Sequence, residues 1–203
     1  MKIICIGRNY VDHVKELKNS IPSVPLFFLK PETALILRNH PFFYPEFSNN
    51  IHYETEIVLK INKVGRHIHE KFSHNYYDEI GIGIDFTARD LQKECIKSGN
   101  PWEISKAFDY SAPIGKFIPK NEFSDLNNIN FSLLINSEIK QKGNTKNMIF
   151  SFDHIISYVS QFLMLKIGDV IFTGTPAGVG PVKIDDRLEA FIESRKLLDF
   201  KIK

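Results

Sequence analysis

The stretch IHYETEIVLKI, residues 51–61, joins an apolar run typical of a buried strand to two carboxylates at its start. Side chains alternate across a strand, so Glu54 and Glu56 are expected on one face, with Tyr53, Thr55 and Ile57 on the other. Two like charges held together repel each other, and a cation between them relieves that repulsion. The pattern taken alone also fits a solvated strand edge, because charged side chains are usually exposed.

Similar apolar, β-branched runs recur along the chain and predict further strands. Helical periodicity is confined to roughly 9–18, 87–98 and 152–164. Strands therefore dominate and helices intervene irregularly, which favours an α+β fold over a doubly wound sheet. Asn136-Ser137-Glu138 resembles a hairpin connection. The predicted strands are KIICI (2–6), LFFLK (26–30), EIVLKI (56–61), EIGIGID (79–85), FSLLIN (131–136), DVIFTG (169–174) and RLEAFIE (187–193).

Length and charge restrict the classes of protein that fit. The 203 residues suit a single domain, 1–203, and no Gly/Ser/Pro-rich linker divides them. With 26 basic and 24 acidic residues the net charge is +2, and no dense Lys/Arg run predicts a nucleic-acid partner. No stretch approaches the roughly 20 apolar residues of a membrane span, so no membrane partner is expected. The run IICIG is too short for a signal-peptide core, and a cytoplasmic location follows as an expectation.

A third carboxylate stands where another predicted strand ends. In EIGIGIDFTARDLQ (79–92) the apolar run stops at Asp85, and Thr87 or Asp90 begins a helix. Three carboxylates without cysteine or well-spaced histidine ligands favour Mg²⁺, Mn²⁺ or Ca²⁺ over Zn²⁺. The alternative is that Asp85 is only a turn or capping residue. Cys5 and Cys95 form no metal-binding pattern and are interpreted as structural.

Several motifs then follow one another in an order typical of one family. The YETE motif is followed, 29 residues after Glu56, by DFTARDLQ (85–92). Next come PWEISKAF (101–108), the FS pair at 150–151 with IISYVSQF (155–162), and GDVIFTGTPAGVGPV (168–182). With GRNYVDHVKEL (7–17) and PLFFLKPETALI (25–36) at the front, nearly the whole chain resembles the fumarylacetoacetate hydrolase family. It is most similar to the small single-domain acylpyruvate hydrolases that also act on oxaloacetate.

The resemblance implies a mixed β-roll with short flanking helices, usually a homodimer, and a metal held by Glu54, Glu56 and Asp85. Mg²⁺ or Mn²⁺ is the implied cofactor, with Ca²⁺ as a non-native occupant. Lys106 would act beside the metal, and His13 and Glu16 match a catalytic dyad on a mobile lid helix, here residues 8–18. The implied substrate contacts are Arg8, Arg89, Gln92 and Thr175. Phe42-Phe43-Tyr44 is interpreted as core or dimer contact.

This residue set predicts chemistry on small 2-oxo acids. The metal would polarise the 2-oxo carbonyl and stabilise the enolate formed when the next bond breaks. Glu16 lies three residues after His13, so on a helix it can orient the imidazole that activates water. The expected reactions are hydrolysis of 3-acylpyruvates and tautomerisation or decarboxylation of oxaloacetate. Two alternatives stay open: a 2-oxo-dienoate hydratase or isomerase of aromatic catabolism, and a metal- or carboxylate-binding protein without turnover.

The N-terminal helix carries its own expectation. Asn9 is a possible cap, and Val11, Val14 and Leu17 form only a thin apolar stripe. Weak anchoring is what a lid requires. We therefore expect this helix to be loosely ordered without ligand and to close over a bound 2-oxo acid.

Overall fold

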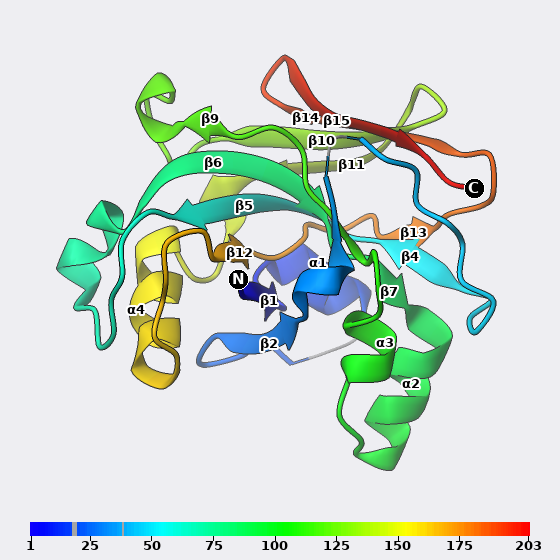
Figure 1. Ribbon diagram of the computed structural model, residues 1–203, viewed down its shortest axis with the longest axis horizontal. Helices are drawn as coiled ribbons and strands as arrows, with labels where there is room; N and C mark the ends of the chain where they lie inside the picture. The colour runs from blue at the N-terminus through cyan, green and yellow to red at the C-terminus, as the bar shows by residue number, and fades with distance from the viewer. Residues whose placement is uncertain (18–19, 38) are drawn as a thin grey trace.

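The predicted apolar runs form the centre of a mixed sheet. In the computed structural model, which describes residues 1–17, 20–37 and 39–203, six strands lie side by side (Figure 1). β1 pairs with β12 in parallel and with β2 antiparallel, so the sheet is mixed. Ile57, Val58 and Leu59 of β5 are fully buried, which shows that both faces of its centre are covered. In sheet order the strands are β2 (Leu26–Lys30), β1 (Ile3–Gly7), β12 (Val170–Phe172), β5 (Thr55–Ile61), β6 (Tyr77–Ile84) and β9 (Ile118–Pro119).

A second, four-stranded sheet lies over β5 and β6 (Figure 1). Its inward side chains, including Leu133 and Ala190, belong to the same apolar cluster as Ile57 and Ile82. Its hairpin turn has Asn136 and Ser137 at φ 52° and 69°, the left-handed geometry of a two-residue connection. The hairpin prediction is confirmed, but Glu138 pairs with Ile135 and so begins the next strand. The strands in order are β11 (Glu138–Asn144), β10 (Asn130–Ile135), β14 (Arg187–Ile192) and β15 (Arg195–Lys201).

Two small sheets complete the α+β fold and bring distant segments together. In the first, His52 of β4 pairs with Thr87 of β7 in antiparallel fashion, so the chain just after His52 lies beside the chain just before Thr87. Its strands are β13 (Gly180–Pro181), β4 (Ile51–Tyr53) and β7 (Thr87–Ala88). The other small sheet joins β3 (Leu35–Ile36) to β8 (Ala112–Pro113).

The three predicted helices are present, each shorter than its sequence pattern. The helix predicted at 87–98 starts at Arg89 because Thr87 and Ala88 pair with β4, so Thr87 is not its first residue. The helix predicted at 152–164 ends at Phe162, and Ser151 caps it by accepting a hydrogen bond from the His154 N–H. The last residue of the segment predicted at 9–18 lies outside the described residues. The helices are α1 (Val11–Glu16), α2 (Arg89–Ser98), α3 (Glu103–Lys106) and α4 (Phe152–Phe162), with 3₁₀ turns η1 (Glu32–Ala34), η2 (Glu70–Asn75), η3 (Lys120–Glu122) and η4 (Thr145–Asn147).

Asn9 does not cap α1, and that prediction is wrong. Tyr10 precedes the helix, while the Asn9 side chain is fully buried and used elsewhere. Its amide donates to the carbonyls of Phe150 (3.0 Å) and Thr173 (2.8 Å) and accepts from the Phe150 N–H (2.7 Å). The start of the lid segment is therefore anchored between the end of β12 and the segment before α4.

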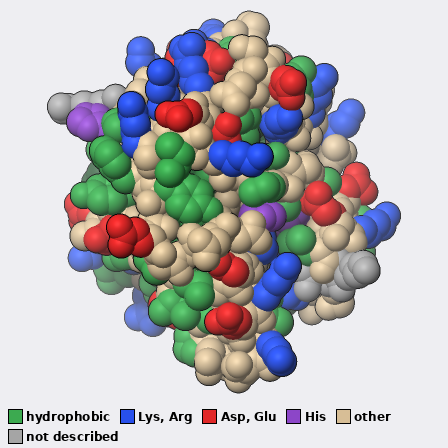
Figure 2. Space-filling model, turned by 90° about the vertical axis from the view of Figure 1, so that its right-hand side faces the viewer, with side chains coloured by type: hydrophobic (Ala, Val, Ile, Leu, Met, Phe, Trp, Pro, Cys, Tyr) green, Lys and Arg blue, Asp and Glu red, His purple; other side chains and the backbone are tan. Residues whose placement is uncertain are grey.

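Charged side chains of both signs lie on the surface (Figure 2), as the near-neutral composition predicts. On the face shown in Figure 2, basic and acidic side chains lie interspersed among apolar ones. Of the helices within residues 1–17, 20–37 and 39–203, none is long and apolar enough to cross a membrane. Cys5 and Cys95 are both buried.

Candidate active site

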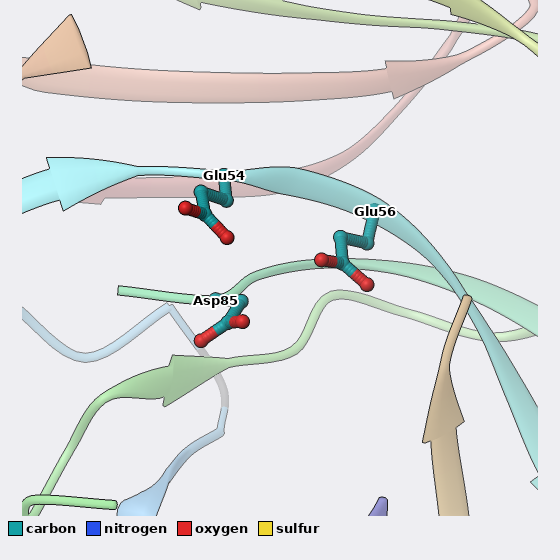
Figure 3. A group of neighbouring side chains, drawn as sticks. All are labelled: Glu54, Glu56 and Asp85. Carbon is teal, nitrogen blue, oxygen red and sulfur yellow. The ribbon is translucent and has the colours of Figure 1, made fainter. Parts of the chain in front are cut away.

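The three predicted carboxylates meet at one place. Glu54 follows β4, Glu56 lies in β5 and Asp85 follows β6, and the Asp85 N–H donates to the Glu54 carbonyl at 2.8 Å. One oxygen from each carboxylate lies within 4.8 Å of the others. Figure 3 shows Glu54, just before β5, and Glu56, within β5, extending from the same side of the chain toward Asp85. The separation within 4.8 Å confirms the expected common face. All three carboxylates are at most 5% exposed, so the alternative of a solvated strand edge is excluded.

Lys106 lies in direct contact with two of these carboxylates. It ends α3, is 3% exposed, and donates to Glu54 at 2.8 Å and to Asp85 at 2.7 Å. A third hydrogen bond, of 2.6 Å, goes to the Thr87 hydroxyl. Three acceptors therefore hold the ammonium at one position between the carboxylates.

Two further buried cations face the same group. The Lys30 side chain is fully buried, and its ammonium lies 2.7 Å from Asp85 Oδ1. Lys30 also donates to the Ser111 carbonyl (3.0 Å) and hydroxyl (2.9 Å). Arg89 donates to Glu54, and to the Gln92 side-chain oxygen at 2.5 Å. Three buried carboxylates thus face three buried cations.

This packing pushes the two glutamate pKa values in opposite directions. Burial alone would raise the pKa of Glu54, but the charges of Lys106 and Arg89 outweigh burial and hold it well below its usual range. Burial and the negative charges of Asp85 and Glu54 raise the pKa of Glu56, although a hydrogen bond from the Gly174 N–H opposes them. For Lys106, burial disfavours the charge, yet Asp85 and Glu54 outweigh it and raise the pKa of the ammonium.

The donor set fits a hard divalent cation. Its atoms are carboxylate oxygens, which Mg²⁺, Mn²⁺ and Ca²⁺ prefer. Asp85 Oδ1 is buried and accepts no hydrogen bond from the described part of the chain, although Lys30 lies within ion-pair distance. Lys30 uses only part of the acceptor capacity of this oxygen, since an ionised carboxylate oxygen has two lone pairs, so the oxygen also suits metal ligation.

The carboxylates line a cavity of about 240 Å³. Of the predicted site residues, only Glu16 does not line it. Glu16 accepts hydrogen bonds from the Gly178 N–H at 3.1 and 3.2 Å and lies 3.3 Å from His13 Nδ1. His13 is 4% exposed, so α1 rests against the cavity. The predicted residues in the lining are Arg8, His13, Glu54, Glu56, Asp85, Arg89, Gln92, Lys106 and Thr175, together with Ile6, Gly7, Leu17, Phe28, Lys93, Ile96 and Trp102.

Sequence reasoning missed several supporting groups. The Gly174 N–H donates to Glu56 at 2.6 Å, and Gln141 of β11 donates to the Thr175 hydroxyl at 2.9 Å. The one available signal was Lys30, a single charge that ends the apolar run LFFLK. Gln141 carries no such mark, because its partners are 34 to 86 residues away in sequence.

Comparisons with known proteins agree over 90% or more of the chain. The family model described as Fumarylacetoacetate (FAA) hydrolase C-terminal matches residues 2–203. The mitochondrial oxaloacetate tautomerase of Mus musculus is 43% identical over 201 residues, covering 99% of this chain and 91% of that protein. The mitochondrial oxaloacetate decarboxylase of Dictyostelium discoideum is 45% identical over 183 residues, covering 90% and 84%. The crystal structure of fumarylpyruvate hydrolase from Pseudomonas aeruginosa, in complex with Mn²⁺ and pyruvate, has a TM-score of 0.94 at 35% identity, covering 100% and 89%.

Proposed function

The chain belongs to the fumarylacetoacetate hydrolase family, and from that premise we propose that it is a divalent-metal-dependent enzyme acting on small 2-oxo acids. The observation that carries the proposal is the buried group of Glu54, Glu56 and Asp85 with Lys106 in contact, inside a cavity that His13 also lines. The names of the relatives support the substrate class: oxaloacetate tautomerase, oxaloacetate decarboxylase and fumarylpyruvate hydrolase.

Glu54, Glu56 and Asp85 would hold the cation, Mg²⁺ or Mn²⁺, with Ca²⁺ as a non-native occupant. The Mn²⁺ in the Pseudomonas aeruginosa structure supports this choice. When bound, such a cation would supply an electrophile that polarises the 2-oxo carbonyl and adds positive charge to the site. Lys106 would be a second electrophile: its three N–H donors go to Glu54, Asp85 and Thr87 here, and one of them would turn to the substrate oxygen to stabilise its negative charge.

The charges of this chain favour a small anionic substrate. Lys30, Lys106 and Arg89 already balance the three carboxylates, so the added charge of the cation is left for the substrate. The cavity of about 240 Å³ is below the roughly 300–1,000 Å³ of drug-sized pockets. Oxaloacetate, with four carbons and two carboxylates, meets both conditions.

His13 would hold and move the proton. Because Glu16 lies against Nδ1, Nε2 is the nitrogen that would accept a proton from the attacking water. Water addition to the distal carbonyl of a 3-acylpyruvate, followed by cleavage of the adjacent C–C bond, gives a carboxylic acid and pyruvate. Oxaloacetate needs no water, since proton transfer at C3 interconverts enol and keto forms and loss of CO₂ from C4 gives pyruvate.

Residues 8–18 would form a lid, with the six-residue α1 at its centre. An isolated helix of that length is not stable in water, so its order depends on its contacts. These contacts are the Asn9 anchor at one end and the hydrogen bonds from Gly178 to Glu16 at the other. The lid is tested by hydrogen exchange of the Val11–Glu16 amides, which should slow when Mn²⁺ and oxalate are added together. Exchange unchanged by both would contradict it.

A homodimer is the expected assembly. Phe42 is buried in the core, whereas Phe43 is 67% exposed and lines an apolar groove with Leu37 and Tyr110. Exposed apolar surface of this kind is typical of protein contacts. Light scattering of the full chain measures the assembly directly. The cytoplasmic location predicted from the sequence stays a prediction, because the mouse and Dictyostelium relatives are mitochondrial by name.

The deciding experiment is a metal-titrated assay of the full chain on four compounds: oxaloacetate, acetylpyruvate, fumarylpyruvate and a 2-hydroxydienoate. We expect Mg²⁺- or Mn²⁺-dependent release of pyruvate from an acylpyruvate, or tautomerisation or decarboxylation of oxaloacetate. Turnover of the dienoate alone would replace this function with the hydratase or isomerase alternative. Metal and oxalate binding without turnover of any compound would leave only a binding protein.

A further inference from the structure

Gln141 belongs to the second sheet, yet its side chain reaches the active site. It lies in β11 and is 2% exposed. Its oxygen accepts from the Thr55 N–H at 3.0 Å, and its nitrogen donates to the Thr175 hydroxyl at 2.9 Å and to the Pro176 carbonyl at 3.0 Å. One amide thus connects the strand that carries Glu56 to the segment that carries Thr175.

Two of these partners fix which end of the amide points where. The Thr55 N–H can only donate, so it must face the Gln141 oxygen. The Pro176 carbonyl can only accept, so it must face the Gln141 nitrogen. A flipped amide would set donor against donor and acceptor against acceptor, inside a buried site where both cost stability.

The orientation of the amide decides what the Thr175 hydroxyl can do. A hydroxyl has one proton to donate, and here its oxygen receives the Gln141 N–H. The hydrogen bonds found between described residues include none in which Thr175 Oγ1 donates. Thr175 lines the cavity and is 3% exposed, so its proton is left for an acceptor inside the cavity.

We propose that Gln141 is a positioning residue that makes the Thr175 hydroxyl a hydrogen-bond donor to an oxygen of the bound substrate. The identity of that substrate, a 2-oxo acid, rests on the proposed function above. A carboxylate or keto oxygen can accept from this hydroxyl, whereas an ammonium group at the same position cannot. Gln141 therefore contributes to the binding of such an oxygen without touching the substrate. Because Thr55 lies between Glu54 and Glu56, the same amide also fixes Thr175 relative to the carboxylates.

The test is a double-mutant cycle read by pyruvate binding. Titration calorimetry of the full chain in saturating Mn²⁺ measures the pyruvate Kd of the wild type, Gln141→Met, Thr175→Val and the double variant. Loss of a hydrogen bond to a charged group predicts about 10- to 100-fold weaker binding for Thr175→Val. Gln141→Met should weaken pyruvate binding about 10-fold in the wild-type background and less than about 2-fold in the Thr175→Val background. Mn²⁺ affinity, titrated separately, should stay within about 3-fold of the wild type, since neither side chain is hydrogen-bonded to the side chain of a proposed ligand.

Asn144→Met provides the matched control. Asn144 is a buried amide in the same strand, and it donates to Asn128 and Asn130 at 2.9 and 2.8 Å, away from the cavity. It should lower thermal stability without changing pyruvate affinity. Should Gln141→Met not fold, Gln141→Glu replaces it in the cycle. The new carboxylate still accepts from Thr55 but attracts the Thr175 proton, and any general charge repulsion cancels between the two backgrounds.

The outcomes separate this inference from the proposed function. If the Gln141 change weakened pyruvate binding equally in both backgrounds, or in neither, the role of Gln141 would be overturned. The proposed function would still stand, because the wild type would still bind pyruvate. If the wild type in Mn²⁺ bound no pyruvate, the proposed function would fail, and the assignment of a 2-oxo acid as the acceptor would fail with it.

Discussion

Replacing Lys30 with methionine should destabilise the protein far more than the same change at a surface lysine. Lys30→Met keeps a side chain of similar length but removes the ammonium. That ammonium lies 2.7 Å from Asp85 and donates to two oxygens of Ser111 and to the Phe86 carbonyl, with the side chain fully buried. The variant therefore leaves a buried carboxylate with less compensation and several buried acceptors without their donor.

The magnitude follows from that burial. Removing one partner of a buried ion pair typically costs about 3–5 kcal/mol, because the remaining charge stays buried without compensation. Lys106 still donates to Asp85, so the lower half of that range, about 3–4 kcal/mol, is expected. For a chain of 203 residues each kcal/mol lowers Tm by about 2–4 °C, which gives a decrease of about 6–16 °C.

Lys60→Met is the matched control. Lys60 lies in β5, and its ammonium is 2.5 Å from Glu79, but the two side chains are 40% and 33% exposed. Exposed pairs contribute less than about 1 kcal/mol, so the control should lose no more than that. Both variants are unfolded with urea in EDTA, so that no metal contributes. Equal losses for Lys30→Met and Lys60→Met would refute the argument that burial makes the Lys30 pair strong.

Three further outcomes are expected. Glu54→Gln and Asp85→Asn should each weaken Mn²⁺ binding at least about 100-fold by calorimetry, because replacing even a residue that only supports a metal ligand lowers metal affinity about 10- to 100-fold. Unchanged Mn²⁺ affinity would exclude Glu54 and Asp85 as ligands. His13→Ala should slow acylpyruvate hydrolysis about 10²- to 10⁴-fold in a pyruvate-release assay and slow oxaloacetate decarboxylation less. If both reactions slowed equally, water activation would not be the role of His13. Burial opposes ionisation of Asp90, but hydrogen bonds from Ser48 and the Asn49 N–H outweigh burial and hold the pKa of Asp90 below its usual value. The folded pKa is the lower one, so this stabilisation is present above the unfolded pKa and is lost as pH falls through the folded value. Asp90→Asn should therefore cost up to about 1 kcal/mol at pH 7 in urea unfolding, with the difference from wild type shrinking below about pH 4; a difference independent of pH would show that its charge is not involved.

The sequence predicts the central strands well because their apolar runs are buried on both faces. The run LFFLK (26–30) coincides with β2, and EIVLKI (56–61) lies within β5. In the second sheet, β15 is not predicted, and β11 follows only from the hairpin connection at 136–138, because neither strand is a long apolar run. In β11 five of seven side chains are at least partly exposed, so no apolar run marks it. Several other missed strands are only two or three residues long, too short to show a period of two.

The group of three carboxylates can be predicted for a local reason, and the residues that support it cannot. Alternation places Glu54 and Glu56 on one face, and the end of an apolar run marks Asp85. Lys30 and Gln141 reach the site only because separate strands pair in three dimensions, and one sequence does not contain those pairings. The roles of His13, Lys106 and Thr175 came from the family resemblance rather than from any local pattern.

Residues 174–178 connect the parts of the site into one unit. The Gly174 N–H binds Glu56, Gln141 holds Thr175 and Pro176, and the Gly178 N–H binds Glu16 on α1. Both glycines have positive φ, 104° and 96°. A Cβ at Gly174 would lie 2.6 Å from the Asn9 Cβ, and one at Gly178 would lie 2.8 Å from the Lys140 carbonyl oxygen. Any side chain at either position would therefore push the segment away from the anchor of α1 or from β11. A substrate held by Thr175 would stabilise this segment, and through Gly178 and Glu16 it would also favour the closed position of the lid.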